Sequence, residues 1–205
     1  VIVVDKAKGN TSFDEIRKIR KEYNIKKVGH TGTLDPMATG VLTILVGEAT
    51  KLSDYLMNHD KEYVATLSLG EKRDTGDSEG KIIETKKVPD LSEKNVKETL
   101  KSFEGEISQI PPKYSAIKVN GKKLYEYARS GEEIEIKPRK VNIFEINLIE
   151  IKENSITFKV HCSKGTYIRT LCEDIAEKLG TVGYMSSLRR TRVGNFTLDD
   201  VGKII

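Results

Sequence analysis

The stretch from Gly29 to Leu42 constrains the fold more than any other part of the chain, because it holds three glycines and one proline around a single carboxylate. Glycine adopts positive φ or admits a close neighbour, while Pro36 fixes φ directly after Asp35 and removes a backbone donor. An apolar stretch, Val41 to Val46, follows. The sequence therefore predicts a stiff loop that presents Asp35 just before a strand. Such a loop is either a tight turn or a site, and composition alone leaves both open.

The composition is that of an ordinary water-soluble globular chain. Of the 205 residues, 37% are hydrophobic and 32% are charged, which is enough for one substantial core. The longest apolar stretch is far below the roughly 20 residues that span a bilayer. No signal-peptide pattern opens the chain, so we expect a cytoplasmic protein without a membrane partner. The only cysteines, Cys162 and Cys172, lie outside metal-ligand spacing, so we expect them to pack and expect no metal or other cofactor.

Positive charge gathers in two places. The net charge is +4, and between Pro112 and Lys140 eight Lys or Arg residues accompany four Glu and three Tyr residues. Arg189, Arg190 and Arg192 form a second basic cluster. Basic residues interleaved with aromatic residues suit phosphate contact and base stacking. The alternative for any one of these charges is a solvated surface position.

The elements indicate one continuous α+β domain with an arm inserted at about residues 112–140. Strands are predicted from period-two alternation or short apolar runs, and helices from three- and four-residue spacing. The predicted strands are Val1–Asp5, Val41–Val46, Tyr63–Leu69, Val141–Ile151, Ile156–Cys162 and about Met185–Val193. Strands that outnumber helices predict a mixed sheet with helices packed on it.

Four helices are predicted. The first begins with a capping box of Ser12 and Glu15, and the second covers about Glu48–Asn58. The third begins at Ser92, and the fourth runs from Ile168 to Leu179. Their apolar faces are predicted to hold Phe13, Ile16, Ile19 and Tyr23 in the first, Ala49, Leu52, Tyr55 and Leu56 in the second, Val96, Leu100 and Phe103 in the third, and Leu171 and Ile175 in the fourth.

Three separated motifs resemble those of the bacterial tRNA pseudouridine-55 synthases, a branch of the pseudouridine synthases. They are Asp5–Ser12, Gly29–Leu42 and Ser163–Leu171, and the likeness covers nearly the whole chain. Two further segments, Gln109–Ala116 and Gly121–Arg129, are similar to the RNA-gripping insertion of that family. The resemblance implies the catalytic fold of the family, an α+β fold with a mixed, mainly antiparallel sheet and packed helices.

The resemblance implies a reaction on a uridine in the T loop of tRNA, at position 55. The N1–C1′ bond breaks, the uracil turns, and C5 bonds to the same sugar. An ionised Asp35 would attack C1′, or stabilise or deprotonate an intermediate at that carbon, and these mechanisms stay open. Because uracil stays in the pocket, no metal or water nucleophile is required. Glycoside hydrolysis, the nearest competing chemistry, usually employs two carboxyl groups, and the Asp35 motif offers one.

The resemblance also implies roles for other residues. Arg169 matches the arginine that pairs with the catalytic aspartate, where a guanidinium would keep the carboxylate ionised and oriented. Tyr63 matches the tyrosine that stacks on the flipped base, and Leu188 matches an apolar residue that walls the uracil pocket. The residues expected to contact the RNA are His30, Lys8, Tyr167, Lys164, Lys122, Lys123, Arg129 and Arg189.

The chain departs from the family pattern in a few places. Ala7 stands where the family usually has proline, and Asn10 where it often has methionine. The sequence reaches Ile205 where many relatives continue into a small C-terminal RNA-binding domain. We therefore expect residues 1–205 to be a catalytic domain without that extra domain, as either a short form or a trimmed chain.

Two other functions compete with a stand-alone tRNA enzyme. A non-catalytic RNA-folding module would use the same surface, but a carboxylate facing anionic RNA argues against it. The catalytic subunit of a guide-RNA particle would share the Asp35 motif, but the insertion at 112–140 favours an enzyme that grips the stem-loop itself. We expect a monomer that binds the tRNA T stem-loop without an obligate protein partner. We also expect an arm that is mobile without RNA, because its charges have few obvious internal partners.

Overall fold

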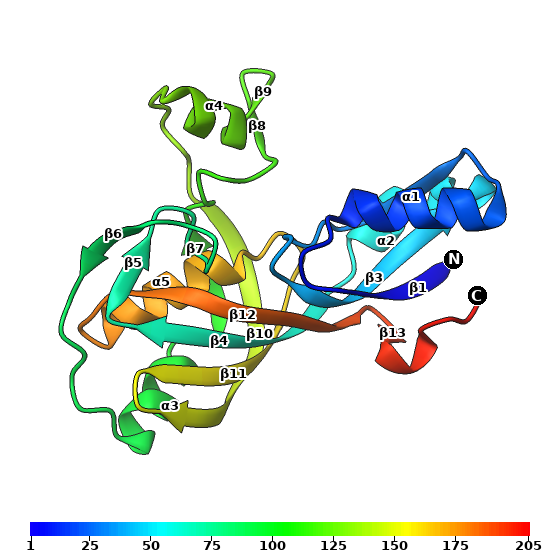
Figure 1. Ribbon diagram of the computed structural model, residues 1–205. Helices are drawn as coiled ribbons and strands as arrows, with labels where there is room; N and C mark the ends of the chain where they lie inside the picture. The colour runs from blue at the N-terminus through cyan, green and yellow to red at the C-terminus, as the bar shows by residue number, and fades with distance from the viewer.

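The computed structural model describes all 205 residues and has one large sheet at its centre (Figure 1). The strands of this sheet are β1 (Ile2–Lys6), β2 (Val28–Thr31), β3 (Thr39–Val46), β4 (Lys61–Leu69), β7 (Gly105–Gln109), β10 (Arg139–Lys152), β11 (Ser155–Cys162), β12 (Gly183–Val193) and β13 (Phe196–Thr197). Their order is β1-β3-β12-β4-β11-β10-β7, with β2 added to β3 and β13 added to β12. Only β3 and β12 pair in parallel. The predicted α+β fold with a mixed, mainly antiparallel sheet is confirmed.

Five α-helices and two short hairpins complete the fold. The helices are α1 (Ser12–Tyr23), α2 (Ser53–Met57), α3 (Glu93–Lys101), α4 (Leu124–Ser130) and α5 (Ile168–Lys178), with 3-10 turns at Gly47–Leu52 and Leu198–Asp200. The hairpins are β5 (Glu71–Arg73) with β6 (Ile82–Thr85), and β8 (Lys118–Val119) with β9 (Lys122–Lys123). None of these helices has the length and the apolar character that a membrane-spanning helix requires.

One face of the central strands carries the core. Along β4 the alternate side chains Tyr63, Ala65 and Leu67 are buried, as period-two alternation predicts. Helix α5 packs on β12 and β4, and α3 packs on β10. The two cysteines are buried in this core as free thiols, and burial raises the pKa of Cys162 to about 12. The packing role predicted for them is confirmed.

The start of α1 differs from the prediction. The capping box consists of Thr11 and Asp14, because Thr11 keeps an extended backbone while Ser12 has already entered the helix. Phe13 is 49% exposed and lies under the guanidinium groups of Arg17 and Arg20, so only part of the predicted apolar face is buried. The Ser12–Glu15 capping box was therefore wrong.

The helix predicted over Glu48–Asn58 is also irregular. Its first part is a 3-10 turn, and α2 covers only Ser53–Met57. Leu52 and Tyr55 are 49% and 69% exposed, while Leu56 is buried. The predicted shared apolar face is wrong because the 3-10 turn changes the angular spacing of these side chains.

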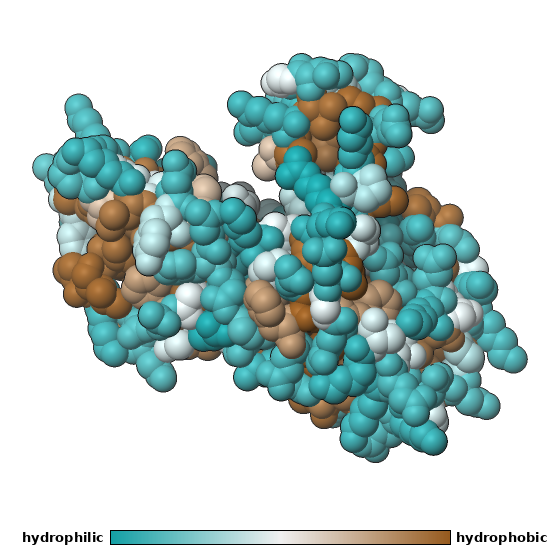
Figure 2. All heavy atoms as spheres, turned by 180° about the vertical axis from the view of Figure 1, so that it is seen from behind, coloured by the Kyte–Doolittle hydropathy of each residue, from teal (hydrophilic) through white to brown (hydrophobic).

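The arm is inserted between two paired strands. Strand β7 ends at Gln109, β10 begins at Arg139, and these two residues are register partners in the sheet. The roots of the arm therefore lie side by side, and α4, β8 and β9 stand away from the body (Figure 1). Seen from behind, the arm is a separate knob with polar side chains around an apolar centre (Figure 2).

Candidate active site

The loop between β2 and β3 carries Asp35 and is held by close backbone packing. Gly40 has a φ of +108°, and a Cβ there would lie 2.1 Å from the backbone oxygen of Arg190. This contact arises because β3 and β12 pair in parallel at these two residues. Only glycine meets both conditions. Gly40 thus lets the end of the loop join the sheet beside β12.

The first sequence motif fastens the other side of this loop. The backbone N–H of Gly9 donates to the Pro36 oxygen at 2.7 Å, and the buried ammonium of Lys6 donates to the same oxygen at 3.3 Å. The Ser12 hydroxyl accepts from Leu34 N–H at 3.0 Å and donates to Leu34 O at 3.2 Å. The residues on both sides of Asp35 are therefore fixed by segment 6–12.

Arg169, on the first turn of α5, reaches the Asp35 carboxylate. Its Nε lies 3.1 Å from Asp35 Oδ2, and its side chain is 7% exposed. Its two terminal nitrogens donate to the backbone oxygens of Thr75 at 3.1 Å and Tyr114 at 3.0 Å. The guanidinium is thus tied to a turn, to the base of the arm and to the carboxylate at once, and it makes one contact with Asp35 rather than two.

Opposing effects act on the Asp35 carboxyl. Burial raises its pKa above the ordinary value of 3.8, although its side chain keeps 33% of its surface exposed. The charges of Arg169 and Lys6 lower the pKa, and that of Asp77 raises it. The net direction is upward, so the arginine offsets only part of the effect of burial. The guanidinium therefore favours the charged form of Asp35, while burial has the larger effect on its pKa.

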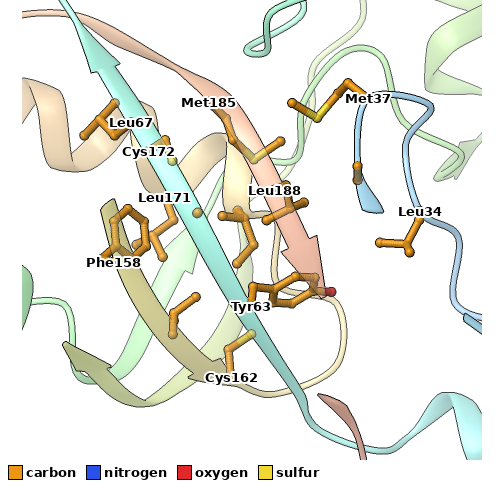
Figure 3. Packing of buried hydrophobic residues seen from close by; sticks show 14 of the residues in the cluster. Leu34, Met37, Tyr63, Leu67, Phe158, Cys162, Leu171, Cys172, Met185 and Leu188 are labelled. Carbon is orange, nitrogen blue, oxygen red and sulfur yellow. The ribbon is translucent and has the colours of Figure 1, made fainter. Parts of the chain in front are cut away.

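An apolar wall lies beside the carboxylate loop. Tyr63 on β4 and Leu188 on β12 are 8% and 7% exposed, and they lie next to one another in Figure 3. Leu34 and Met37 come from the Asp35 loop and face them in the same view. Burial raises the pKa of the Tyr63 hydroxyl, so the ring stays neutral. Two loop residues and two sheet residues thus form a buried apolar wall beside the Asp35 loop.

His30 lies on β2, in the strand that leads into the loop. Its Nδ1 is buried and has no hydrogen-bond partner. Burial and the charge of Arg190 lower the pKa of this imidazole, which favours the neutral form. Arg190 is itself 1% exposed, and it donates to Val41 O at 2.8 Å and to Gly32 O at 3.0 Å. An uncompensated imidazole nitrogen therefore lies close to a buried cation that braces the loop.

The remaining predicted RNA contacts outside the arm lie in different surroundings. Lys8 is exposed and forms no ion pair or hydrogen bond. Lys164 donates to the Asn58 side chain at 2.5 Å, and Tyr167 is half-buried at the start of α5. Arg189 points two nitrogens at the Asp5 carboxylate, at 2.9 and 3.1 Å. Of these residues, Tyr167 lies two positions before Arg169 in the chain. The guanidinium of Arg189 already forms an ion pair with the Asp5 carboxylate.

The three arm cations that were expected to contact RNA have partners within the arm, contrary to expectation. Lys122 pairs with Glu132 at 2.6 Å and lies 4.6 Å from the Tyr127 ring centre. Lys123 and Arg129 both lie over Tyr125, at 5.4 and 5.1 Å. These pairs are local to the arm, and within residues 112–140 only Ser115 and Leu124 are buried. The mobility of the arm stays a prediction.

A cleft of about 1250 Å³ separates the arm from the β5–β6 hairpin and α5. Its walls include Thr75 and Tyr114, the two residues whose backbone oxygens hold Arg169. Acidic and basic side chains mix along it, and no group of three or more acidic, histidine or cysteine side chains is placed to hold a metal ion. The cleft opens next to the arginine rather than over Asp35.

Sequence reasoning missed several residues that build the site. Asp77 is 6% exposed; its carboxylate accepts from the Thr75 hydroxyl at 2.8 Å and from Glu79 N–H at 3.0 Å, which shapes the turn whose carbonyl holds Arg169. The stretch 74–80 is rich in turn-forming residues, and nothing in it marks Asp77 as part of a site. Lys6 and Arg190 were also missed, because a buried cation is rare and nothing in the local sequence distinguishes it from a surface charge.

Comparison with protein families identifies the family of this chain. Residues 20–168 match the model described as TruB family pseudouridylate synthase (N terminal domain). The chain belongs to the TruB family of pseudouridylate synthases. A second model, tRNA pseudouridylate synthase B C-terminal domain, matches residues 169–203. That stretch contains α5 and β12, which pack in the main body. As a member of this family, the chain is an enzyme of the class that isomerises uridine to pseudouridine.

Curated relatives of this TruB-family chain share about half of its residues. The tRNA pseudouridine synthase B of Hydrogenovibrio crunogenus is 48% identical over 204 residues, which cover 100% of this chain and 67% of that protein. The tRNA pseudouridine synthase B of Clostridium tetani is 52% identical over 200 residues, covering 98% of this chain and 69% of that protein. The chain thus spans about two thirds of the length of these relatives.

Solved structures agree on the fold. The chain superposes on a Cbf5–Nop10–Gar1 complex with a TM-score of 0.76 and 34% identity, over 97% of this chain and 50% of that chain. An H/ACA RNP bound to a substrate RNA containing 2′-deoxyuridine gives a TM-score of 0.71 and 32% identity, over 97% of this chain and 48% of that one. The TruB-family chain spans about half the length of these solved chains.

Proposed function

We propose that this chain converts a uridine in the T loop of tRNA, at position 55, into pseudouridine without a guide RNA, and that Asp35 acts at C1′. The observation that carries the proposal is the single carboxylate on a braced loop, 3.1 Å from Arg169, beside the apolar wall of Tyr63 and Leu188. One acid suffices, because the detached uracil is itself the group that bonds again to the sugar.

Each residue has a distinct part in this reaction. The ionised Asp35 acts at the sugar carbon, and Arg169 holds its oxygen in place and favours the charged form. Tyr63 gives the extruded uracil a neutral ring to stack on, and Leu188 excludes water beside it. His30, on the strand β2 that leads into the loop, would support the extruded nucleotide from beside Asp35. The order of bond breaking and attack at C1′ stays open.

The arm supplies grip rather than chemistry in this proposal. Extruding a base from a folded loop costs a few kcal/mol, which stacking and phosphate contacts offset. Lys122, Lys123 and Arg129 lie on the arm, and Lys8, Lys164, Tyr167 and Arg189 would add contacts from the body. The whole of residues 1–205 would serve as the catalytic domain, acting as a monomer in the cytoplasm.

A guide-dependent subunit is the second candidate, because solved neighbours include chains from H/ACA particles. Identity to the two relatives named tRNA pseudouridine synthase B, 48% and 52%, exceeds the 34% identity to the chain of the Cbf5–Nop10–Gar1 complex. A non-catalytic RNA-folding module is less well supported, because it has no use for the Asp35–Arg169 pair.

Tritium release from C5-labelled uridine tests the proposal. The native chain, Asp35→Asn and a T-loop-mutated transcript are compared on unmodified tRNA. Release that requires both Asp35 and the T loop supports a guide-free synthase. Binding without release would overturn the proposal in favour of a guide-dependent subunit or a folding module.

A further inference from the structure

Two buried neutral side chains each fasten the backbone of a residue beside the Asp35–Arg169 pair. Ser12 binds both the N–H and the oxygen of Leu34, the residue directly before Asp35. Gln109 binds both the N–H and the oxygen of Tyr167, two residues before Arg169. Ser12 is 3% exposed and Gln109 is 1% exposed. The two partners of one ion pair are thus fixed in the same way, from different elements.

The Gln109 contact fixes the residue at which α5 begins. Tyr167 is the N-cap residue of this helix, yet its side chain makes no capping hydrogen bond. The Gln109 Oε1 accepts from Tyr167 N–H at 2.9 Å, and its Nε2 donates to Tyr167 O at 3.2 Å. A primary amide is the side chain that offers one donor and one acceptor in this spacing. The first turn of α5, which carries Arg169, is therefore set by the end of β7.

The same residue is also the root of the arm. Gln109 is the last residue of β7 and the register partner of Arg139, where β10 begins. Beyond it, Ile110 O accepts from the Thr170 hydroxyl at 3.1 Å, and Tyr114 O accepts from Arg169 at 3.0 Å. The arm and the first turn of α5 are therefore joined by a short set of hydrogen bonds.

Resting on the proposed function, we propose that Ser12 and Gln109 are positioning residues, which hold Asp35 and Arg169 at the separation that the reaction at C1′ needs. Neither side chain touches the carboxylate, and each acts through the backbone of a neighbour. A displacement of about 1 Å in a reacting group lowers a rate by about a hundredfold. Without the Ser12 hydroxyl, the Asp35 loop can move away from Arg169. Without the Gln109 amide, the first turn of α5 can move and carry Arg169 with it.

The test uses Ser12→Ala and Gln109→Met, which remove the hydrogen bonds while nearly keeping volume. We expect kcat at saturating tRNA to fall about 10- to 100-fold in each, with KM changed by less than about twofold. The matched control is Ser186→Ala, which removes one hydroxyl hydrogen bond to a backbone oxygen, that of Thr66 at 3.2 Å, away from Leu34 and Tyr167 in the chain. It should keep native kcat.

A second readout needs no activity. The Asp35 carboxyl carbon is titrated by NMR in the native chain and in both variants. The charges that act on it are Arg169 from α5, Lys6 from β1 and Asp77 from the turn before β6. If Arg169 moves away, the ionised form of Asp35 loses a stabilising positive charge. The titration midpoint of Asp35 should therefore rise in both variants. A merely lower folded fraction would leave the midpoint of the folded molecules where it was.

The outcomes separate the two claims. An unchanged midpoint in either variant, or a native kcat in either, overturns the positioning role. If the native chain forms no pseudouridine, the proposed function fails, and the titration alone then decides whether the two side chains set the ion pair. If Gln109→Met does not fold, Ser12→Ala carries the test, because it removes one oxygen only.

Discussion

The Asp35 loop and the arm over residues 112–140 are both irregular connections between strands, but they are held in different ways. The loop is fixed through backbone groups, by the buried cations Lys6 and Arg190 and by the Ser12 hydroxyl. The arm is fixed mainly by its own surface pairs, such as Lys122 with Glu132. A buried polar contact to backbone leaves little freedom, whereas exposed ion pairs contribute about 0–1 kcal/mol each.

This difference suits two tasks. A reacting carboxylate must be placed within a fraction of an ångström, while a surface that grips a folded RNA gains from adapting to it. The loop is therefore expected to control the rate and the arm to control affinity. The connection between them is the short segment after Gln109, whose backbone oxygens hold Thr170 and Arg169.

The largest expected effect comes from Asp35→Asn. The rate of pseudouridine formation should fall by at least about a thousandfold, because the group that acts at C1′ is gone. The melting temperature should stay the same or rise, since the folded state no longer contains a partly desolvated carboxylate and Arg169 keeps its two carbonyl partners. Tritium release and a thermal melt measure the two effects, and a variant that keeps a tenth of the native rate would contradict the account.

The next largest effect is on stability and contrasts two glycines. Gly40→Ala should lower the free energy of unfolding by about 3 kcal/mol or more, because a Cβ would meet the Arg190 oxygen at 2.1 Å in a left-handed backbone. The matched control is Gly121→Ala in the arm, where φ is +78° and no atom lies within 4 Å of the added carbon. It should cost only about 1–2 kcal/mol of local strain. Urea unfolding compares them, and equal decreases would show that the loop is no more tightly built than the arm.

The pH dependence of kcat is a smaller effect, and it should depend on the Asp35 loop but not on the arm. Since the reaction needs ionised Asp35 and burial raises its pKa, kcat should fall on acidification through a midpoint above 3.8. Below that midpoint the rate should drop about tenfold per pH unit. Substitutions in the arm should leave the midpoint alone. A profile with no acid limb above 3.8 would contradict the burial of this carboxyl.

The smallest effect belongs to the arm. A Lys122→Ala, Lys123→Ala, Arg129→Ala triple variant should raise KM for tRNA by about tenfold and change kcat little. The slope of log K against log salt should fall by about 1 for each phosphate that the variant no longer neutralises. The control is Lys152→Ala on β10, whose ammonium pairs only with Glu150 at 3.6 Å. A triple variant with native KM but reduced kcat would reverse the roles of loop and arm.

The sequence was a good guide wherever chemistry or periodicity is local. The alternation from Tyr63 to Leu69 predicted a half-buried strand, and the glycines around Asp35 predicted a stiff loop. The capping box predicted at Ser12 and Glu15 was wrong, because the box in the structure lies one residue earlier, at Thr11 and Asp14. The hydroxyl of Ser12 instead binds the backbone of Leu34, a contact between distant parts of the chain that local sequence does not show. Gln109 could not have been assigned from sequence, because its partner is 58 positions away.

The arm shows the same limit from the other direction. The sequence showed its basic residues, but it did not show that these residues would form cation–π contacts with the tyrosines between them. Helix α4 was also missed, because it has only seven residues and Leu124 is its one buried side chain. Short elements that depend on a few contacts leave little periodic signal.

The most direct test of this division is single-turnover pseudouridine formation with enzyme in excess over unmodified tRNA. The native chain, the triple arm variant and Asp35→Asn are compared as enzyme concentration rises to saturation. We expect the arm variant to reach the native rate once its tRNA is fully bound, while Asp35→Asn binds tRNA and stays inactive at every concentration. An arm variant that remains slow when saturated, or an Asp35→Asn variant that reacts, would contradict the account.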